Sequence, residues 1–186
     1  MPPKIKVTKD DIINTAIQIV RKSSAESINA RTIASALNCS TQPIFSNFAT
    51  MEELHHAVIV KADEWYQSYI RQEIASGKYP SYKASGMAYI RFAKEEKEMF
   101  KLLFMRDRAK NEEDFDNKNF DCMVTFVQSY TGLSEEDAKL FHLELWACVH
   151  GIATMFATGF LDLDWDLVSN MISDTYFGLR KQYGME

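Results

Sequence analysis

The sequence has few of the residues that interrupt helices or crosslink extracellular folds. Its 186 residues include only seven glycines, four prolines and three cysteines. The scarcity of glycine and proline, with hardly any alternation of apolar and polar residues, predicts a mostly helical chain. The cysteines are widely spaced and form no Cys-x-x-Cys pair, which argues against a disulfide framework and predicts reduced thiols: Cys39, Cys122 and Cys148.

Signals for secretion and for membrane insertion are also missing. The lysines of the N-terminal stretch MPPKIKVTKDD are followed by no apolar run, so this stretch does not resemble a signal peptide. The most apolar segment, residues 143–160, is interrupted by Glu144 and His150 and is shorter and more polar than a bilayer-spanning helix. We therefore expect a cytoplasmic protein.

The sequence offers no recognisable set of catalytic or metal-binding residues. His142 and Glu144 have the H-x-E spacing of zinc deaminases, but no Pro-Cys-x-x-Cys follows them. The histidines at 55, 56, 142 and 150 lack metal-ligand spacing and nearby carboxylate or thiolate partners, and no glycine-rich phosphate loop occurs. We expect neither metal nor cofactor, and an enzyme is the weakest of the functional alternatives.

Charge is distributed unevenly along the chain. The net charge is −5, yet residues 1–48 carry six basic and three acidic side chains and the remainder has a net charge of −8. A basic end on an acidic body can indicate contact with nucleic acid, although charged residues often only solvate a surface.

Two short helices are predicted in the first forty residues. Thr8 and Asp11 form a capping box that opens the first helix. Asn29 caps the second, which covers about residues 30–37, and Asn38 then provides a left-handed turn. The apolar stripe of the first helix has helical spacing: Ile13, Ala16, Ile17 and Val20.

A third helix and a long fourth helix follow. Ser40 is expected to cap the third, which has Pro43 in its first turn, where proline loses no hydrogen bond. Thr50 and Glu53 form another capping box, which opens a fourth helix that continues to about Ala75.

The third helix has a polar but uncharged outer side. Ile44 and Phe48 suffice for its packing, and the tight turn before it completes a helix-turn-helix arrangement. Uncharged hydrogen-bonding groups at a helix start suit base edges in the major groove. The alternative is a three-helix bundle with a polar face. The side chains left facing outward are Thr41, Gln42, Phe45, Ser46 and Asn47.

The stretch INARTIASALNCSTQPIFSNFATMEEL, residues 28–54, resembles the DNA-binding signature of the TetR family of bacterial regulators. The resemblance covers about residues 8–60. The family usually has Tyr at the position of Phe45 and Lys at the position of Met51, and both contact phosphate, so these departures predict weaker salt-dependent binding. The positions that match the family's pattern are Phe45, Phe48, Thr50, Glu53 and Leu54.

The rest of the chain also has helical patterns. Two amphipathic helices are expected within residues 81–104, with a break near Lys97, and then a charged loop over 107–119. A helix over 120–130 is followed by a long apolar helix, opened by Ser134 and Asp137, that reaches about residue 158. A last helix is capped by either Asp164 or Asp166.

The stretch LELWACVHGIATMFATGF is similar to a Trp-x-x-x-His-Gly motif of one TetR subgroup. The resemblance implies a sensor domain that dimerises through its two C-terminal helices, packed as a four-helix bundle across a two-fold axis. Ala147 and Gly151 suit close backbone approach, although core packing explains them as well. The aromatic and Met-rich residues expected around an apolar or cationic ligand are Met87, Ile90, Phe104, Phe126, Trp146 and His150. For His150 the alternative is a hydrogen-bonded core histidine.

These patterns predict an all-α protein. Residues 1–50 form a helix-turn-helix DNA-binding domain, and residues 51–186 form a helical ligand-binding and dimerisation domain that begins with a connecting helix over 51–76. The predicted function is that of a repressor released from a palindromic operator by a small molecule; the alternative is a helical interaction module that has lost DNA binding. The residues expected to contact double-stranded DNA are Arg31, Thr32, Ser40, Thr41, Gln42, Phe45, Ser46, Asn47 and Thr50.

Overall fold

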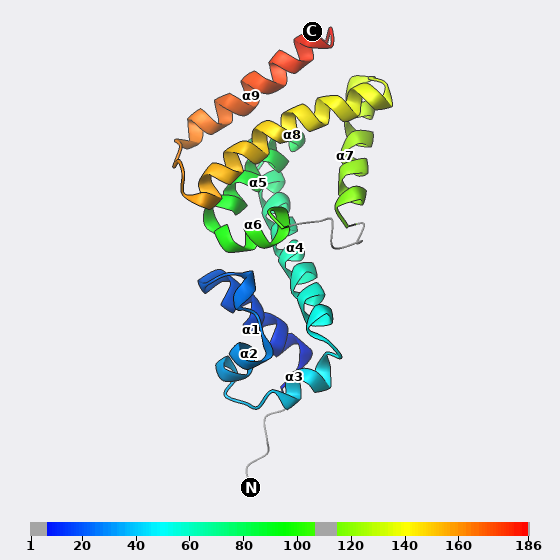
Figure 1. Ribbon diagram of the computed structural model, residues 1–186. Helices are drawn as coiled ribbons and strands as arrows, with labels where there is room; N and C mark the ends of the chain where they lie inside the picture. The colour runs from blue at the N-terminus through cyan, green and yellow to red at the C-terminus, as the bar shows by residue number, and fades with distance from the viewer. Residues whose placement is uncertain (1–6, 107–114, 186) are drawn as a thin grey trace. The chain divides into compact units, whose positions relative to one another are not determined.

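The computed structural model describes residues 7–106 and 115–185, and within these ranges the regular structure is entirely helical (Figure 1). This confirms the predicted all-α class. Contacts between residues divide the chain into two compact units, Met1–Tyr69 with Glu95–Arg106 and Ile70–Lys94 with Asp107–Glu186. The predicted domain boundary at residue 50, placed at the expected end of the helix-turn-helix domain, stays a prediction.

The first unit has a small apolar core surrounded by short helices. In the stripe of the first helix, Ile12 is buried in place of the expected Ile13. Both positions fit a helical period, and packing against the neighbouring helices decides between them. The helices of this unit are α1 (Lys9–Lys22), a 3-10 turn (Ala25–Ser27), α2 (Ala30–Ala36), α3 (Gln42–Asn47), most of α4 (Met51–Ala75) and α6 (Lys97–Phe104).

Local capping explains where α1 and α2 begin and end. The Thr8 hydroxyl accepts from the Asp11 N–H at 3.1 Å, and the Asp11 carboxylate accepts from the Thr8 N–H at 2.9 Å, which confirms the predicted box. Asn29 caps α2 in the same way with Thr32. Asn38 has a φ of 52°, as predicted for the turn that follows α2.

The cap predicted for α3 is wrong. The helix begins at Gln42, and Thr41 at its N-cap already has near-helical angles (φ −72°, ψ −15°) and makes no side-chain cap hydrogen bond. Ser40 therefore lies too early in the turn to reach the free N–H groups of the first helical turn. Pro43 lies in that first turn, as expected.

The second unit contains the end of α4 and the helices α5 (Ser81–Glu95, up to residue 94), α7 (Phe115–Thr131), α8 (Glu135–Thr158) and α9 (Trp165–Gln182). The structure starts α7 at residue 115 rather than at residue 120, because a charged stretch of sequence is as compatible with a helix as with a loop. Residues 107–114 of the predicted loop lie outside the described residues. Asp164 is the cap of α9, since its carboxylate accepts from the N–H groups of Asp166 and Leu167.

The apolar helix α8 combines a buried side with exposed apolar residues. Phe141, Ile152 and Phe156 are buried, whereas Leu143 and Trp146 are exposed. By length and composition alone α8 is the one helix of the described residues that passes for a membrane span, a test that the core helix of a soluble protein also passes.

Two tyrosine–histidine pairs join α5 to α8 within the second unit. The Tyr82 hydroxyl lies 2.8 Å from Nδ1 of His142, and the Tyr89 hydroxyl lies 2.8 Å from Nδ1 of His150. Burial lowers the pKa of His142. The hydrogen bond between Tyr89 and His150 fits the interpretation of His150 as a hydrogen-bonded core histidine. Contact between His150 and a ligand stays a prediction.

Candidate nucleic-acid interface

The six-residue helix α3 is too short to be stable alone, so its position depends on tertiary contacts. Ile44 and Phe48, the two apolar residues predicted to anchor it, are buried. The Phe48 ring also lies beneath the Lys9 ammonium, 4.9 Å from the ring centroid. These contacts fix one side of α3 and leave the opposite side to solvent.

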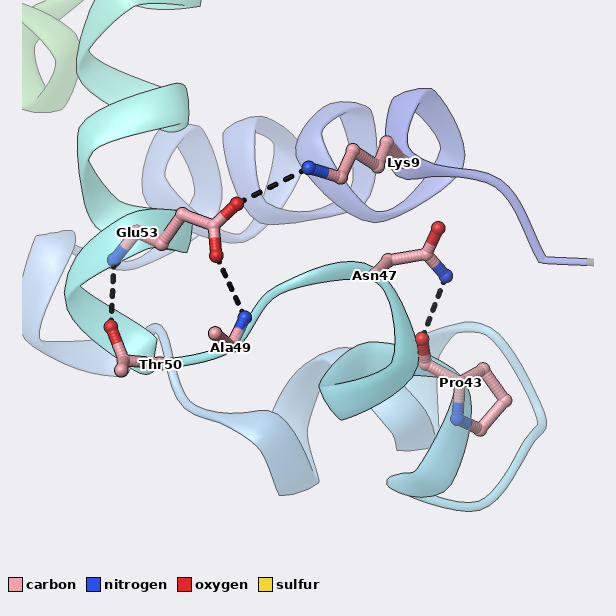
Figure 2. A network of polar contacts seen from close by, with 6 residues as sticks. All are labelled: Lys9, Pro43, Asn47, Ala49, Thr50 and Glu53. Carbon is pink, nitrogen blue, oxygen red and sulfur yellow. Dashed lines mark hydrogen bonds and ion pairs between the residues drawn. The ribbon is translucent and has the colours of Figure 1, made fainter.

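A polar network holds the turn between α3 and α4 (Figure 2). Lys9 Nζ lies 3.2 Å from Glu53 Oε1, and Glu53 Oε2 accepts from the Ala49 N–H at 2.7 Å. The Glu53 N–H in turn donates to the Thr50 hydroxyl at 3.1 Å. The Ala49 N–H, followed by Lys9, lowers the pKa of Glu53. The predicted Thr50–Glu53 box is thus half formed, because the carboxylate bonds to Ala49 instead of to the Thr50 N–H.

The side-chain amide nitrogen of Asn47 faces the interior of the first unit. Nδ2 donates to the Pro43 carbonyl at 2.7 Å (Figure 2) and to the Val7 carbonyl at 3.4 Å. The side chain therefore fastens α3 to itself and to the segment before α1. This arrangement favours a positioning role for Asn47 over the base contact expected from the sequence.

The outer side of α3 offers hydrogen-bonding groups next to an aromatic ring. Gln42 and Ser46 are exposed, Thr41 is partly buried, and the Phe45 side chain is 53% exposed. The Ser46 hydroxyl donates to the Gln42 carbonyl at 2.9 Å. Gln42 thus has the longest polar side chain of this surface.

The remaining predicted contacts surround α3. Arg31 is exposed in the first turn of α2, and its N–H donates to the Asn29 side chain. The hydroxyls of Thr32 and Thr50 belong to the caps of α2 and α4. Ser40 is exposed in the turn before α3. DNA contact by each of these residues stays a prediction.

A partly buried ion pair connects α1 to the residue before α6 inside the first unit. Arg21 reaches both carboxylate oxygens of Glu96, with Nε and an Nη each 2.7 Å from an oxygen, and its guanidinium lies 4.7 Å from the Trp65 ring centroid. The Glu96 side chain is only 8% exposed. No local sequence pattern predicts this pair, because the two residues are 75 positions apart.

The six residues of the predicted ligand pocket are divided between the two units. Phe104 belongs to the first unit, where its ring lies 5.1 Å from that of Tyr66, and the other five belong to the second. Trp146 and His150 do come together, with stacked rings 4.7 Å apart. Met87 and Ile90 are fully buried, and Phe126 is exposed beside Tyr82. The pocket stays a prediction.

Replacing Asn47 with alanine tests its positioning role. We expect the free energy of unfolding to fall by about 1 kcal/mol, because a hydrogen bond to a backbone carbonyl is lost, and DNA affinity to fall equally for all sequences. Thermal unfolding and binding to a panel of single-base operator variants measure both effects. Ser46→Ala, on the outer side of the same helix, is the control and should change stability by less than about 0.5 kcal/mol. A lost preference at one base with unchanged stability would identify Asn47 as a base reader instead.

Comparison with known proteins gives one family match, over the C-terminal half of the chain. Residues 82–173 match a family model described as the tetracyclin repressor-like, C-terminal domain. No curated protein matches the sequence at a significant level.

Solved structures share the fold, among them the three that follow. A TetR-like transcriptional regulator from Rhodococcus sp. RHA1 aligns with a TM-score of 0.71 and 12% identity over 99% of both chains. The multidrug binding protein EbrR, complexed with imidazole, aligns at 0.63 and 14% identity, over 90% of this chain and 93% of its own. A second transcriptional regulator from Rhodococcus sp. Rha1 aligns at 0.63 and 12% identity, over 95% and 97%. At these identities the likeness concerns the fold alone.

Proposed function

We infer that this chain is a repressor which leaves a palindromic operator when a small molecule binds, and the match of residues 82–173 to the tetracyclin repressor-like C-terminal domain supports this. The observation that carries this proposal is the outer side of α3, with Gln42 and Ser46 exposed on a short helix fixed from behind by Ile44 and Phe48. Such a helix can enter the major groove and present hydrogen-bonding groups to base edges. Its site of action is the cytoplasm.

The proposed DNA contacts fall into two kinds. Gln42 pairs with a base, since a side-chain amide can bind adenine through two hydrogen bonds, and Thr41 and Ser46 support it. Arg31 binds a phosphate together with the N–H groups at the start of α2. Phosphate contacts give affinity to any sequence, whereas the base contact gives the preference.

We propose that the protein acts as a homodimer through α8 and α9. These helices expose Leu140, Leu143 and Phe177, and a side chain at Gly151 would meet nothing within 4 Å, which leaves room for a second helix. A two-fold dimer presents two α3 helices to half-sites about 34 Å, or one turn of DNA, apart or more. Light scattering at micromolar concentration should report a dimer, and a monomer would contradict this assembly.

The proposed effector is apolar or cationic. The stacked rings of Trp146 and His150 offer the kind of flat surface that attracts an organic cation, and the solved relative EbrR is described as multidrug binding. Tetraphenylphosphonium is a suitable probe for calorimetry with and without operator DNA. Because coupling is reciprocal, DNA should weaken its binding by the factor by which the ligand weakens DNA binding. Equal affinities in the two titrations would show that this ligand does not release the protein from DNA.

A helical interaction module is the second candidate, favoured by the exposed aromatic ring of Phe45 and by the absence of a basic residue at Met51. A purified dimer that binds no DNA sequence more tightly than any other would support it over the repressor.

Met51→Lys should strengthen DNA binding and steepen its dependence on salt. Met51 is the first residue of α4 and is partly exposed, so a lysine there can add a phosphate contact. The slope of log K against log salt should change by about one unit per phosphate gained in each subunit. Fluorescence anisotropy at several salt concentrations measures the slope, with Met51→Gln as the uncharged control. An unchanged slope would place the start of α4 away from the DNA backbone.

A further inference from the structure

An unusual cation lies near the start of α5 in the second unit. The Lys83 ammonium donates to the Ser169 hydroxyl at 2.7 Å and to the Ser173 hydroxyl at 2.8 Å, both on α9. It also lies 4.8 Å from the centroid of the Tyr79 ring. All four residues are partly exposed.

The position of Lys83 is electrostatically unfavourable for a cation without a counterion. Lys83 is the third residue of α5, where the helix dipole is positive, and the first turn of α5 contains no acidic residue. Among the described residues no carboxylate forms an ion pair with it, whereas Lys94, in the last turn of the same helix, pairs with Asp162 at 2.6 Å. A second cation, Lys78, lies 5.1 Å from the same Tyr79 ring, and the charges of Asp166 and Glu73 act on it.

Lys83 and Ser169 each keep a hydrogen-bond donor that the contacts between them do not use. An ammonium has three N–H donors, and two of those of Lys83 are used by the serines. The Ser169 hydroxyl accepts from Lys83 and so keeps its own proton for another acceptor. One oxyanion can therefore take hydrogen bonds from Lys83 and Ser169 while it neutralises the ammonium.

We propose that Lys83 and Ser169 form a binding site for a small oxyanion, a carboxylate or phosphate group. Ser173 only holds the ammonium in place, because its own hydroxyl donates to the Ser169 carbonyl at 3.1 Å. Charge-assisted hydrogen bonds of this kind are among the strongest in proteins. The site differs in place and in chemistry from the effector site proposed at Trp146 and His150. The competing explanation is purely structural: Lys83 fastens α9 to α5 and binds nothing further.

Titration with inorganic phosphate, without DNA, separates the two explanations. Amide chemical shifts of α5 and α9 are followed at constant ionic strength, with chloride exchanged for phosphate, in the wild type, in Lys83→Met and in Lys94→Met. The last variant removes the same charge from the same helix. We expect wild type and Lys94→Met to bind phosphate alike, and Lys83→Met to bind it at least about tenfold more weakly, because a hydrogen bond to a charged group is lost. Acetate in a parallel titration shows whether a carboxylate serves as well as a phosphate.

Equal phosphate affinity in Lys83→Met and wild type would overturn the proposal. Amide shifts of the wild type that do not change when phosphate replaces chloride would overturn it as well. If Lys83→Met does not fold, Ser169→Ala is the variant to use, because it keeps the ammonium and its hydrogen bond to Ser173. Ser169→Ala should weaken phosphate binding several-fold. Unchanged phosphate binding in this variant would also overturn the proposal. Because no DNA is present, failure of this site and failure of the proposed repressor function are separate results.

Discussion

Arg21→Ala should lower the free energy of unfolding of the first unit by about 3 kcal/mol, the lower end of the range for breaking a buried ion pair. The variant leaves the Glu96 carboxylate, 8% exposed, without the two 2.7 Å hydrogen bonds from Arg21. It also removes the guanidinium from the Trp65 ring. The lower end applies because the Arg21 side chain itself is 35% exposed. Chemical denaturation monitored by the fluorescence of Trp65 measures the loss.

The pair between Lys9 and Glu53 provides the matched control for Arg21. Its side chains are 55% and 44% exposed, so solvent screens their attraction. Lys9→Ala should cost less than about 1 kcal/mol. If both variants lost the same stability, burial of Glu96 would not be what makes the Arg21 pair important. Arg21→Lys keeps the charge but not the two-pronged geometry, and should fall between the two.

Gln42→Ala should weaken operator binding by about 1–3 kcal/mol and relax the preference for one base in each half-site. Gln42 is exposed at the first turn of α3, and its side chain is the longest polar group on the outer side of that helix. Stability should not change, since the side chain is exposed and the backbone carbonyl that accepts from Ser46 remains. Anisotropy titrations against operator variants, each with one base changed, measure the effect.

Arg31→Ala is the comparison for Gln42→Ala. Arg31 is exposed at the start of α2 and is proposed to bind a phosphate, so its loss should weaken binding to all sequences alike and lower the salt slope by about one unit per phosphate contact. Equal loss of base preference in both variants would contradict the division of roles between α2 and α3.

The features predicted correctly from the sequence are those set by neighbours along the chain. The caps at Thr8 and Asn29 and the left-handed turn at Asn38 each depend on side chains within a few residues. The prediction at Ser40 was wrong because α3 begins only at Gln42, after Thr41, which stands at the N-cap without a side-chain cap hydrogen bond. A capping residue can be recognised by type, but the exact start of a short helix depends on the turn before it.

The contacts that position α3 could not be predicted from the sequence. Lys9 and Glu53 are 44 positions apart, and no local pattern distinguishes them from other surface charges. Asn47 was assigned to the outer side by its place on the helix, yet its amide bonds to Pro43 and Val7. The ligand pocket is hardest for the same reason, since buried aromatic and methionine residues have the same spacing whether they fill a core or line a cavity.

Selection of DNA from a randomised duplex pool tests the central claim, sequence-specific binding by paired α3 helices, most directly. The wild-type protein should enrich an inverted repeat whose half-sites are centred one helical turn apart or more, and Gln42→Ala should enrich the same repeat with one position per half-site relaxed. Recovery of no common sequence, or of a single asymmetric site, would contradict the account.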